Sequence, residues 1–486
     1  MKICFVTSEV APYSKSGGLG DVGRALSEAL ASRGHDVVVV SPAYRGVLPI
    51  TAPTSSRLTV PAGGQDHVLE VRTLTASTSS VRHRFLAHAV YDRDGLYGDD
   101  RGAFGDNHFR FALLCRGALE LAHRELGWSD DAFVFHVHDW QTALLPLLLD
   151  AAYRPVGRFE RAASVLTLHN PAHQGRLPPE LFVDLELPAR WFSPMGLEFY
   201  GDLGLLKGGL LHADQITTVS PTFATEIVEP GGGFGLEDVL AGRAEDLTGI
   251  LNGIDEDEWN PAADAFLPAP FTAADLSGKA RCKAELQVEL GLPVDPDAPL
   301  VGSVGRLDPQ KGVELLLDSV PWLVEQGAQL VVLGSAAAAH RRYEEAWKAM
   351  ERRFPTHVRA WVGFSEAVAH RIEAGSDLFV MPSLFEPCGL NQFYSQRYGT
   401  PPIVRRTGGL ADSVQEGPEG TGFVFSAPHA KALRDAMYRA IALFRDDPEG
   451  MDALRRRCMA LDRSWGPAIT AYEDVYARAL AQRGGG

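Results

Sequence analysis

Short apolar, β-rich runs alternate with helical segments along most of this chain, and the alternation starts twice. In the first half the run KICFVTS (2–8) is followed by the helical segment RALSEALASRG and then by the strand-like HDVVVVSP. Strand–helix alternation predicts a parallel sheet covered by helices. Because the pattern begins again at about residue 280, the sequence predicts an α/β protein with two doubly wound domains.

The boundary between the domains is predicted at the Asn-Gly turn within ILNGIDEDEWNP, which a Pro- and Ala-rich segment follows. The N-terminal domain then covers 1–250 and the C-terminal domain covers 251–462. Residues 463–486 are predicted to form a helix that packs back on the N-terminal domain, and to end in a disordered GGG tail. A length of 486 residues suits two or three domains of about 100–200 residues each.

Composition excludes several classes of function. With 45% hydrophobic and 22% charged residues, the chain is of the ordinary soluble globular type. A net charge of −16 argues against a nucleic-acid or anionic-membrane partner, since both need a cationic face. The five cysteines are scattered without a CxxC pair, so neither a disulfide framework nor a zinc site is indicated. No leader and no run of 18 apolar residues is visible, and we expect a cytoplasmic protein.

The stretch DLFVMPSLFEPCGLNQFYSQRYGTPPIVRRTGGLAD (377–412) reads as strand, loop, helix, strand and loop. Its carboxylate Glu386 stands directly before Pro-Cys-Gly and the expected helix. In an open parallel sheet, ligands bind at the carboxyl ends of strands, where these loops lie. An acid at a helix start is also stabilised by the helix dipole alone, and for Glu386 the two interpretations are equally favoured.

The segment Gly18-Leu-Gly-Asp-Val-Gly matches the GxGxxG pattern of dinucleotide-binding domains. Its context is wrong, because the first glycine stands well past the strand and Ser41-Pro42 replaces the acid that would hold a ribose. What remains is a flexible glycine loop that carries Lys15 at the mouth of a sheet, which suits a phosphate-bearing ligand. A merely exposed Lys15 is the alternative.

The loop RLDPQKG is a second candidate anion site, because Arg306 and Lys311 flank a strand end and a glycine introduces the next helix. Backbone amides, the helix dipole and two cations together suit a diphosphate, whereas a solvated loop explains them equally well. Taken with Lys15, these cations predict an anionic leaving group held between the two domains. Such electrostatic stabilisation needs no metal ion.

Two predicted strands, FVFHVHDW and SVLTLHN, end in histidine. His136 and His138 share one strand face, so a metal site is conceivable, but no further ligand cluster supports one. His169 ends the next strand, which places imidazoles at the same edge of the sheet. Structural histidines are the alternative, and their shared location favours a functional site.

The chain contains the motifs KSGGLGDV, HVHDW, TLHN, LKGGLLHADQITTVSPTFATEI, GILNGIDEDEWNP, GRLDPQKG, FEPCGLNQFYSQRYGT and VRRTGGLADSV. Together they resemble the motifs of the bacterial glycogen synthase and plant starch synthase family. The resemblance extends from residue 2 to about residue 478. It implies a GT-B type glycosyltransferase fold, with two Rossmann-like domains facing across a deep cleft. It also implies transfer of glucose with retention from ADP-glucose to the non-reducing end of an α-1,4-glucan (glycogen), without metal or cofactor.

The resemblance also assigns roles to individual residues. Glu386 would contact the donor glucose near the reacting carbon, His169 would hydrogen-bond that glucose, and Arg306 and Lys311 would bind the diphosphate. The implied catalytic residues are thus Glu386, His169, Arg306 and Lys311. The implied substrate-binding residues are Lys15, Gly18 and Asp21 (nucleotide sugar), Tyr97 and Asp139 (sugar pocket), Asn252, Phe364 (adenine), and Cys388, Gly389 and Leu390 (amides at the phosphates).

Some positions depart from the family pattern. Ser16 replaces the usual threonine and keeps its hydroxyl, Gln141 replaces a histidine, and HNPAHQG replaces HNLAYQG. Phe364 replaces a tyrosine, so that stacking on adenine would survive without the hydroxyl. GSAAA (334–338) replaces GSGDP, which affects base or ribose contacts. Tyr394 stands where broader relatives carry a second glutamate, so no ribose role is assigned to it.

For the mechanism we expect attack by the acceptor hydroxyl on the face from which the diphosphate leaves, with Glu386 stabilising positive charge on the sugar. A covalent intermediate would need a second carboxylate, for which Asp139 is the candidate. The alternatives are a related enzyme that uses UDP-glucose or another acceptor, a pyridoxal-dependent phosphorylase, and a catalytically impaired glucan-binding relative.

Overall fold

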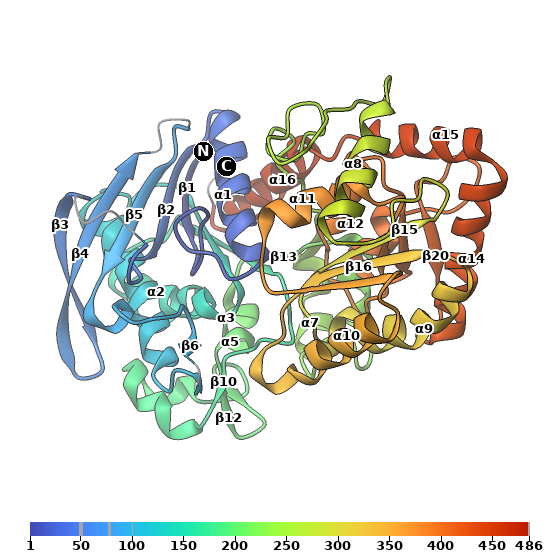
Figure 1. The fold of residues 1–486 in the computed structure, drawn as a ribbon. Coiled ribbons are helices and arrows are strands. Elements are labelled where there is room, and N and C mark those ends of the chain that lie inside the picture. Colours follow the sequence, from blue (N-terminus) through green and yellow to red (C-terminus); the bar gives the residue numbers. More distant parts are fainter. Residues whose placement is uncertain (48–51, 76–78, 100, 485–486) are drawn as a thin grey trace. The chain divides into compact units, whose positions relative to one another are not determined.

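The computed structural model describes residues 1–47, 52–75, 79–99 and 101–484, and its chain divides into two compact units (Figure 1). Unit 1 comprises Met1–Asn252 together with Trp465–Gly486, and unit 2 comprises Gly253–Ser464. The chain therefore passes from one unit to the other twice. Of the tail predicted to be disordered, residues 485 and 486 lie outside the described residues.

One large sheet forms the centre of unit 1. In the described part of the unit it has nine strands, in the order β14-β13-β9-β8-β1-β2-β5-β4-β3. Neighbouring strands from β14 to β5 are parallel. The strands are β1 (Lys2–Val6), β2 (Asp36–Pro42), β3 (Thr54–Ala62), β4 (Gln65–Thr75), β5 (Arg82–Ala87), β8 (Val134–His138), β9 (Ala163–Leu168), β13 (Gln215–Thr218) and β14 (Leu247–Gly249).

The antiparallel hairpin of β3 and β4 extends this sheet beyond β5. The strand β3 buries every second residue from Leu58 to Ala62, as a strand with one covered face does. Two smaller sheets complete the described part of the unit. They consist of β6 (Gly98–Asp99) with β7 (Gly102–Ala103), and of β10 (Arg176–Leu177), β12 (Asp202–Gly204) and β11 (Glu198–Phe199).

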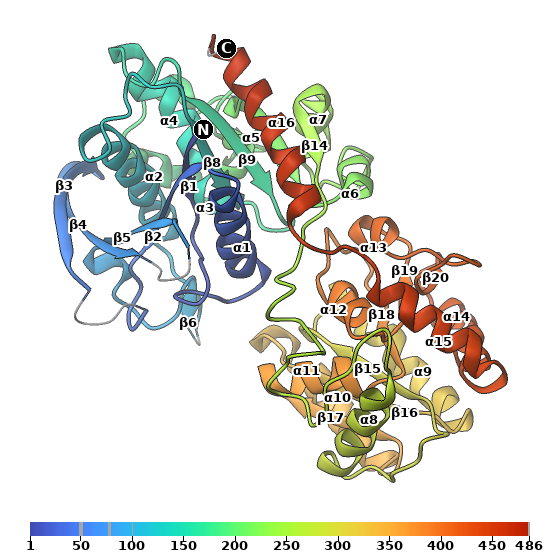
Figure 2. The same ribbon diagram turned by 90° about the horizontal axis from the view of Figure 1, so that it is seen from above.

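Side chains of the central strands alternate between two helical layers. Ile3 and Phe5 of β1 pack in one cluster with α1 and α16, whereas Cys4 and Val6 pack in another with α2, α4 and α5. The helix α16 lies beside α1 and along β8 and β9 (Figure 2). The helices of unit 1 are α1 (Gly18–Ser32), α2 (Asn107–Arg124), α3 (Asp139–Thr142), α4 (Leu144–Leu148), α5 (Leu205–His212), α6 (Pro221–Glu226), α7 (Glu237–Ala241) and α16 (Gly466–Gln482).

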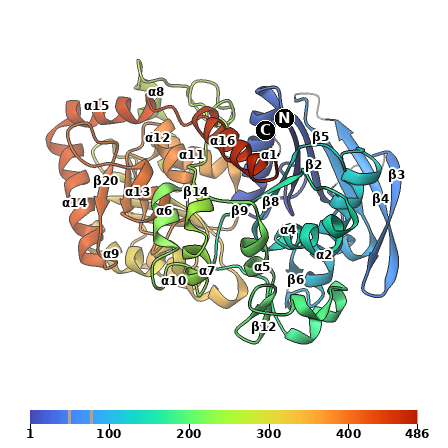
Figure 3. The ribbon, with the colours of Figure 1, turned by 180° about the vertical axis from the view of Figure 1, so that it is seen from behind.

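At the β14 edge of the sheet the chain forms α6, which lies beside β14 (Figure 3). Ser220 caps this helix, because its hydroxyl accepts a hydrogen bond from the backbone amide of Phe223, and Pro221 occupies the first helical position. Both residues are typical of a helix start.

Unit 2, all of whose residues are described, contains a six-stranded parallel sheet in the order β17-β16-β15-β18-β19-β20. Its strands are β15 (Leu300–Val304), β16 (Gln329–Gly334), β17 (Val358–Val362), β18 (Leu378–Met381), β19 (Pro402–Arg405) and β20 (Phe423–Phe425). Its helices are α8 (Ser277–Glu289), α9 (Val313–Glu325), α10 (Arg342–Arg353), α11 (Glu366–Gly375), α12 (Asn391–Arg397), α13 (Gly408–Ser413), α14 (Ala430–Asp446) and α15 (Pro448–Met459).

Helices cover both faces of this sheet as well. The helices α9, α10, α14 and α15 share one apolar cluster with the sheet, and α8, α11 and α13 share another on the opposite face (Figure 1). The helix α15 and the helical state of Gly408–Ser413 were not predicted, since the sequence indicated a loop at Thr407-Gly408-Gly409. The doubly wound architecture of both units agrees with the predicted fold class.

In both sheets the order of the strands reverses beside the strand that begins the pattern. In unit 1 the chain proceeds from β1 outward to β2 and later returns to the other side of β1 as β8. In unit 2 it proceeds from β15 to β16 and β17 and returns beside β15 as β18. Such switch points are where open α/β sheets bind ligands, at the carboxyl ends of the strands. Within the described ranges, no helix is both long and apolar enough to cross a membrane.

Candidate active site

The switch point of unit 1 holds the loop after β1, which is organised by the buried carboxylate of Glu9. Glu9 accepts hydrogen bonds from the backbone amide of Ser16 (2.5 Å), from the Ser16 hydroxyl (2.7 Å) and from the Tyr97 hydroxyl (2.6 Å). The Tyr97 oxygen also lies 2.8 Å from the Ser8 hydroxyl. Glu9 thus fixes the segment that carries Lys15, which is a role that the sequence did not reveal.

Lys15 lies at the open side of this loop, and its ammonium group is 2.7 Å from a carboxylate oxygen of Asp21. The glycine segment beyond it is not the flexible loop that the sequence predicted, because Gly18 is already the first residue of α1. Gly20 and Gly23 are required for close packing instead: a Cβ at Gly23 would stand 2.6 Å from the carbonyl oxygen of Glu9. The first turns of α1 therefore press directly against the Glu9 loop.

Asp139 follows β8 at the same edge of the sheet and adopts the left-handed backbone conformation, with φ of 54°. One of its carboxylate oxygens accepts the backbone amide of His169 at 2.7 Å, which joins the ends of β8 and β9. Burial raises the pKa of this carboxyl to about 7, although the amides of His169 and Asn170 lower it. Asp139 can therefore exist in both protonation states near neutral pH.

His169 lies next to His138, with 3.1 Å between a ring nitrogen of each. Burial lowers the pKa of His169 to about 4 and that of His138 below its usual range, so both imidazoles are neutral at pH 7. Both ring nitrogens of His136 are engaged, one with the Thr167 hydroxyl at 2.6 Å and one with the Tyr476 hydroxyl at 2.8 Å. His136 consequently belongs to the core, and the described residues contain no His/Cys/Asp/Glu group suited to a metal ion.

Asn252 stands at the end of unit 1 and is buried. Its side-chain oxygen has no hydrogen-bond partner among the described residues.

The switch point of unit 2 brings together Lys311, after β15, and Glu386, after β18. The Lys311 ammonium group donates to both carboxylate oxygens of Glu386, at 2.9 and 2.7 Å. The Ser383 hydroxyl donates to the second oxygen at 2.8 Å. Glu386 is buried, so this pair attracts more strongly than a surface pair would. The sequence predicted both residues at the site but not their bond to each other.

Arg306 differs from Lys311, with which it was predicted to share a ligand. Its guanidinium is exposed and lies 3.6 Å from the Asp308 carboxylate and 3.4 Å from the Gln310 side-chain oxygen. Asp308 itself caps the short helix Pro309–Lys311 by accepting the Lys311 backbone amide. Arg306 therefore keeps most of its donors directed to solvent, where an anion can reach them.

The Cys388–Leu390 segment between Glu386 and α12 packs against the first turn of α13. Gly389 has φ of +73° and Gly408 has φ of +43°. A Cβ atom added to Gly408 would lie only 2.0 Å from the carbonyl oxygen of Glu386. The Gly409 amide donates to the carbonyls of Glu386 and Pro387, both at 3.1 Å. These glycines allow two chain segments to approach within backbone distance, which is why helix α13 begins where the sequence indicated a loop.

A network of buried polar side chains forms hydrogen bonds to the Cys388–Leu390 segment and to α13. The Gln392 side-chain amide donates to the carbonyls of Cys388 (3.0 Å) and Gly389 (3.2 Å). The Gln396 amide donates to the Ser413 carbonyl at 3.0 Å, and Arg463 donates to that carbonyl at 2.7 Å and to the Gln396 oxygen at 3.1 Å. The network joins α12, α13 and the segment that leaves unit 2. The sequence pattern did not indicate the bonds to Ser413 and Arg463, because these residues are far from α12 along the chain.

Two further positions were singled out in unit 2. Phe364 follows β17 and its ring is exposed, as a stacking platform requires. Tyr394, which replaces the second glutamate of broader relatives, stacks on Trp259 with ring centroids 3.6 Å apart. Trp259 in turn stacks on His370 at 3.8 Å, so Tyr394 helps to fasten the Trp259 segment to the domain.

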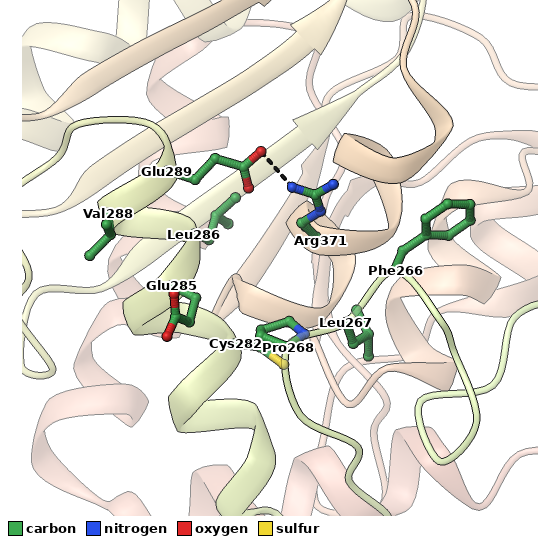
Figure 4. A pocket seen from close by; sticks show the side chains of 9 residues that line it. All are labelled: Phe266, Leu267, Pro268, Cys282, Glu285, Leu286, Val288, Glu289 and Arg371. Atoms are coloured by element: carbon green, nitrogen blue, oxygen red, sulfur yellow. Dashed lines mark hydrogen bonds and ion pairs between the residues drawn. The ribbon is translucent and has the colours of Figure 1, made fainter.

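A separate pocket of about 430 Å³ lies between the 266–268 segment, α8 and α11 (Figure 4). Its wall is largely apolar, and the ion pair of Glu289 with Arg371 (2.5 Å) closes one side. None of the predicted site residues lines this pocket. The candidate site is thus defined by the strand-end loops.

Comparisons with known proteins match these loops and the sheets that carry them. The starch synthase catalytic domain model matches residues 2–242, and the glycosyl transferases group 1 model matches residues 291–452. A glycogen synthase of Myxococcus xanthus is 46% identical over 99% of this chain and 100% of its own length. The chain belongs to the glycogen and starch synthase family.

Other members of the family are similar to this chain over most of its length. Soluble starch synthase 1 of Solanum tuberosum is 43% identical over 98% of this chain and 78% of its own length. The catalytic domain of starch synthase IV from Arabidopsis thaliana, solved with ADP and acarbose bound, superposes with a TM-score of 0.90 at 34% identity, covering 99% of both chains. The chain is therefore a glycosyltransferase of the GT-B fold class, as its motifs predicted.

Proposed function

We propose that this protein is a glycogen synthase. It transfers glucose with retention from ADP-glucose to the non-reducing end of an α-1,4-glucan and releases ADP. The observation that carries the proposal is the Lys311–Glu386 pair at the switch point of unit 2. It places a buried, hydrogen-bonded carboxylate at a strand end in a chain that is 46% identical over its length to a glycogen synthase.

We assign donor binding to the strand-end loops at the switch points of both units, which are called the half-sites below. Arg306, whose donors face solvent, binds the diphosphate together with backbone amides of the Cys388–Leu390 segment. Phe364 stacks on the adenine. Lys15 contributes a second cation from unit 1 and exchanges Asp21 for the nucleotide sugar.

The sugar is bound by polar groups of unit 1 in this proposal. Neutral His169 donates a hydrogen bond to a glucose hydroxyl, and Tyr97 and Asp139 line the sugar pocket. Glu386 faces the reacting carbon, where its negative charge stabilises the positive charge that develops on the ring. Lys311 holds this carboxylate in position through hydrogen bonds to both of its oxygens.

In the reaction, the bond between C1 of glucose and the diphosphate oxygen breaks, and its electron pair leaves with ADP. The acceptor hydroxyl forms the new bond to C1 on the same face. Its proton passes to the departing diphosphate oxygen, so that no protein base and no glucosyl-enzyme intermediate is required. Trapping a glucosyl adduct on Glu386 would overturn this pathway.

The test is release of ADP from ADP-glucose with glycogen as acceptor. The wild type should release ADP only when both substrates are present, and UDP-glucose should be turned over more slowly. A preference for UDP-glucose would favour the related glucosyltransferase instead. Absence of turnover with either donor would favour a glucan-binding relative that has lost catalysis. Orthophosphate-dependent release of glucose 1-phosphate with a pyridoxal absorbance band would favour a phosphorylase.

A further inference from the structure

We infer that the hairpin of β11 and β12 in unit 1 binds the acceptor glucan away from the reacting end, with the ring of Tyr200 as its stacking platform. This inference rests on the proposed function, because the ligand is the glucan acceptor of that reaction. No residue of this hairpin was singled out by the sequence.

Tyr200 stands at the tip of the hairpin in an unusual setting. Tyr200 and Gly201 both have positive φ, of 52° and 85°, as the two central residues of a type I′ turn do. Asn-Gly is the favoured pair for such a turn, and a bulky residue with positive φ is an outlier. The side chain is nonetheless 71% exposed, so it is not retained for burial. An exposed aromatic ring held on a strained backbone indicates a binding role.

The ring is also positioned by its neighbours. The Phe199 ring lies 4.7 Å away at an interplanar angle of 56°, and the Arg176 guanidinium stands 6.0 Å from the Tyr200 centroid. Arg176 is in turn held by the Asp202 carboxylate at 2.6 Å. The ring is therefore supported before any ligand arrives, which lowers the entropic cost of binding.

This combination fits a sugar chain better than other ligands. A pyranose offers an apolar face to stack on a ring and a rim of hydroxyl groups to hydrogen-bond. Tyr200 supplies the ring, and the half-exposed Arg176 and Asp202 supply a donor and an acceptor beside it. Because their charges offset each other, the site suits a neutral ligand.

Strand pairing and backbone hydrogen bonds connect the hairpin to the half-site of unit 1. The loop that begins at His169 runs through Gln174 and Gly175 into β10, which pairs with β12 at Arg176. The amides of Leu205 and Leu206 donate to the carbonyls of Gly175 (3.3 Å) and Gln174 (3.1 Å). Since Arg176 is seven residues beyond His169, the two lie at most about 25 Å apart. An oligosaccharide acceptor can therefore extend from one to the other.

The experiment compares acceptors of different length in the full-length protein. Tyr200→Ala should raise the KM for glycogen about 3- to 10-fold, the range expected for loss of one aromatic contact, and leave the KM for ADP-glucose unchanged. The KM for maltotriose should stay at the wild-type value, because a short acceptor does not reach the hairpin. Tyr200→Phe should behave as the wild type, since it keeps the ring.

A matched control is Tyr438→Ala, which removes a tyrosine that is 60% exposed on α14 of unit 2. It should leave every acceptor constant unchanged. Equal loss in Tyr438→Ala and Tyr200→Ala, or an equal effect of Tyr200→Ala on glycogen and maltotriose, would overturn the inference.

Retardation in native gels that contain glycogen measures the same surface without catalysis. Tyr200→Ala should migrate faster than the wild type there, even if no ADP were released by either. Equal retardation would overturn the inference. A change in oligomeric mass on Tyr200→Ala, measured by sedimentation, would also overturn it, because it would identify the hairpin as a contact between copies of the chain.

Discussion

The two half-sites each contain a lysine paired with a carboxylate, but the pairs differ in burial. The side chains of Lys15 and Asp21 are 40% and 30% exposed, whereas those of Lys311 and Glu386 are 25% and 6% exposed. An exposed pair contributes about 0–1 kcal/mol, and removing one partner of a buried pair costs about 3–5 kcal/mol. Lys15 can thus exchange its partner for a phosphate at little cost. Lys311 is bonded to Glu386, so that of the two cations predicted at the site in unit 2 Arg306 is the one available to a ligand.

The largest effect should come from Glu386→Ala, which removes the only part of either pair that we place at the reacting carbon. We expect kcat for ADP release to fall about 10³-fold, the size of loss seen when a group that stabilises transition-state charge is removed. Glu386→Gln should lose nearly as much, because it keeps the shape and not the charge. Glu289→Ala, a carboxylate of the same unit outside the site, is the control. Near-normal kcat in Glu386→Ala would contradict the assignment.

Removing the lysines tests the comparison directly. Lys311→Ala leaves a buried carboxylate without its cation, and we expect the free energy of unfolding to fall by about 3 kcal/mol. Lys15→Ala should change it by less than about 1 kcal/mol. Urea unfolding measures both. Adding Glu386→Gln to Lys311→Ala should restore part of the lost stability, and equal losses in the two single variants would refute the distinction between the pairs.

Unit 1 also holds Asp139, whose carboxyl group stays protonated up to about pH 7 because it is buried. The unfolded chain releases this proton near pH 4, so ionisation favours unfolding, by an amount that grows from about pH 4 to pH 7 and is constant above. Asp139→Asn cannot ionise, and asparagine tolerates the positive φ. We expect it to stabilise the protein by about 3 kcal/mol more at pH 8 than at pH 4.5. Asp66→Asn, at an exposed position of β4, is the control, and a pH-independent gain would contradict the interpretation.

The smallest effect on the fold should come from Arg306→Ala. Its exposed guanidinium contributes little to stability, so urea unfolding should change by less than about 0.5 kcal/mol. The KM for ADP-glucose should rise about 10-fold or more, as expected for lost charge-assisted hydrogen bonds to a diphosphate. Arg371→Ala in the separate pocket should leave that KM unchanged. A large loss of stability in Arg306→Ala would show that Arg306, like Lys311, is committed to the fold.

The strand ends could be predicted from the sequence because each is marked locally, by an apolar run that stops at polar or glycine residues. That signal located Asp139, His169, Arg306 and Glu386 correctly at sheet edges. It could not reveal which loops meet, since this depends on the order of strands. The Lys311–Glu386 bond spans 75 residues and exists because β18 returns beside β15.

Glycine residues were the least reliable indicators of secondary structure. Its flexibility indicated loops at Gly18 and Gly408, where the structure has the first turns of α1 and α13. In both cases the absence of a side chain serves a close approach between backbones, at Gly23 to Glu9 and at Gly408 to Glu386. Such contacts are made by tertiary packing, which overrides the local preference of glycine against helices.

The double passage of the chain has a consequence for its synthesis. The face of the unit 1 sheet that holds Ile3 and Phe5 is covered by α16, whose Tyr472 and Tyr476 are fully buried. The ribosome makes this sheet first but adds α16 only after the 212 residues of unit 2 (464 − 252). At roughly 5–20 residues per second this takes about 10–40 s. During that interval the nascent chain carries an apolar face that α16 does not yet cover, so a chaperone that protects it should raise the yield of active protein more than one that acts after release.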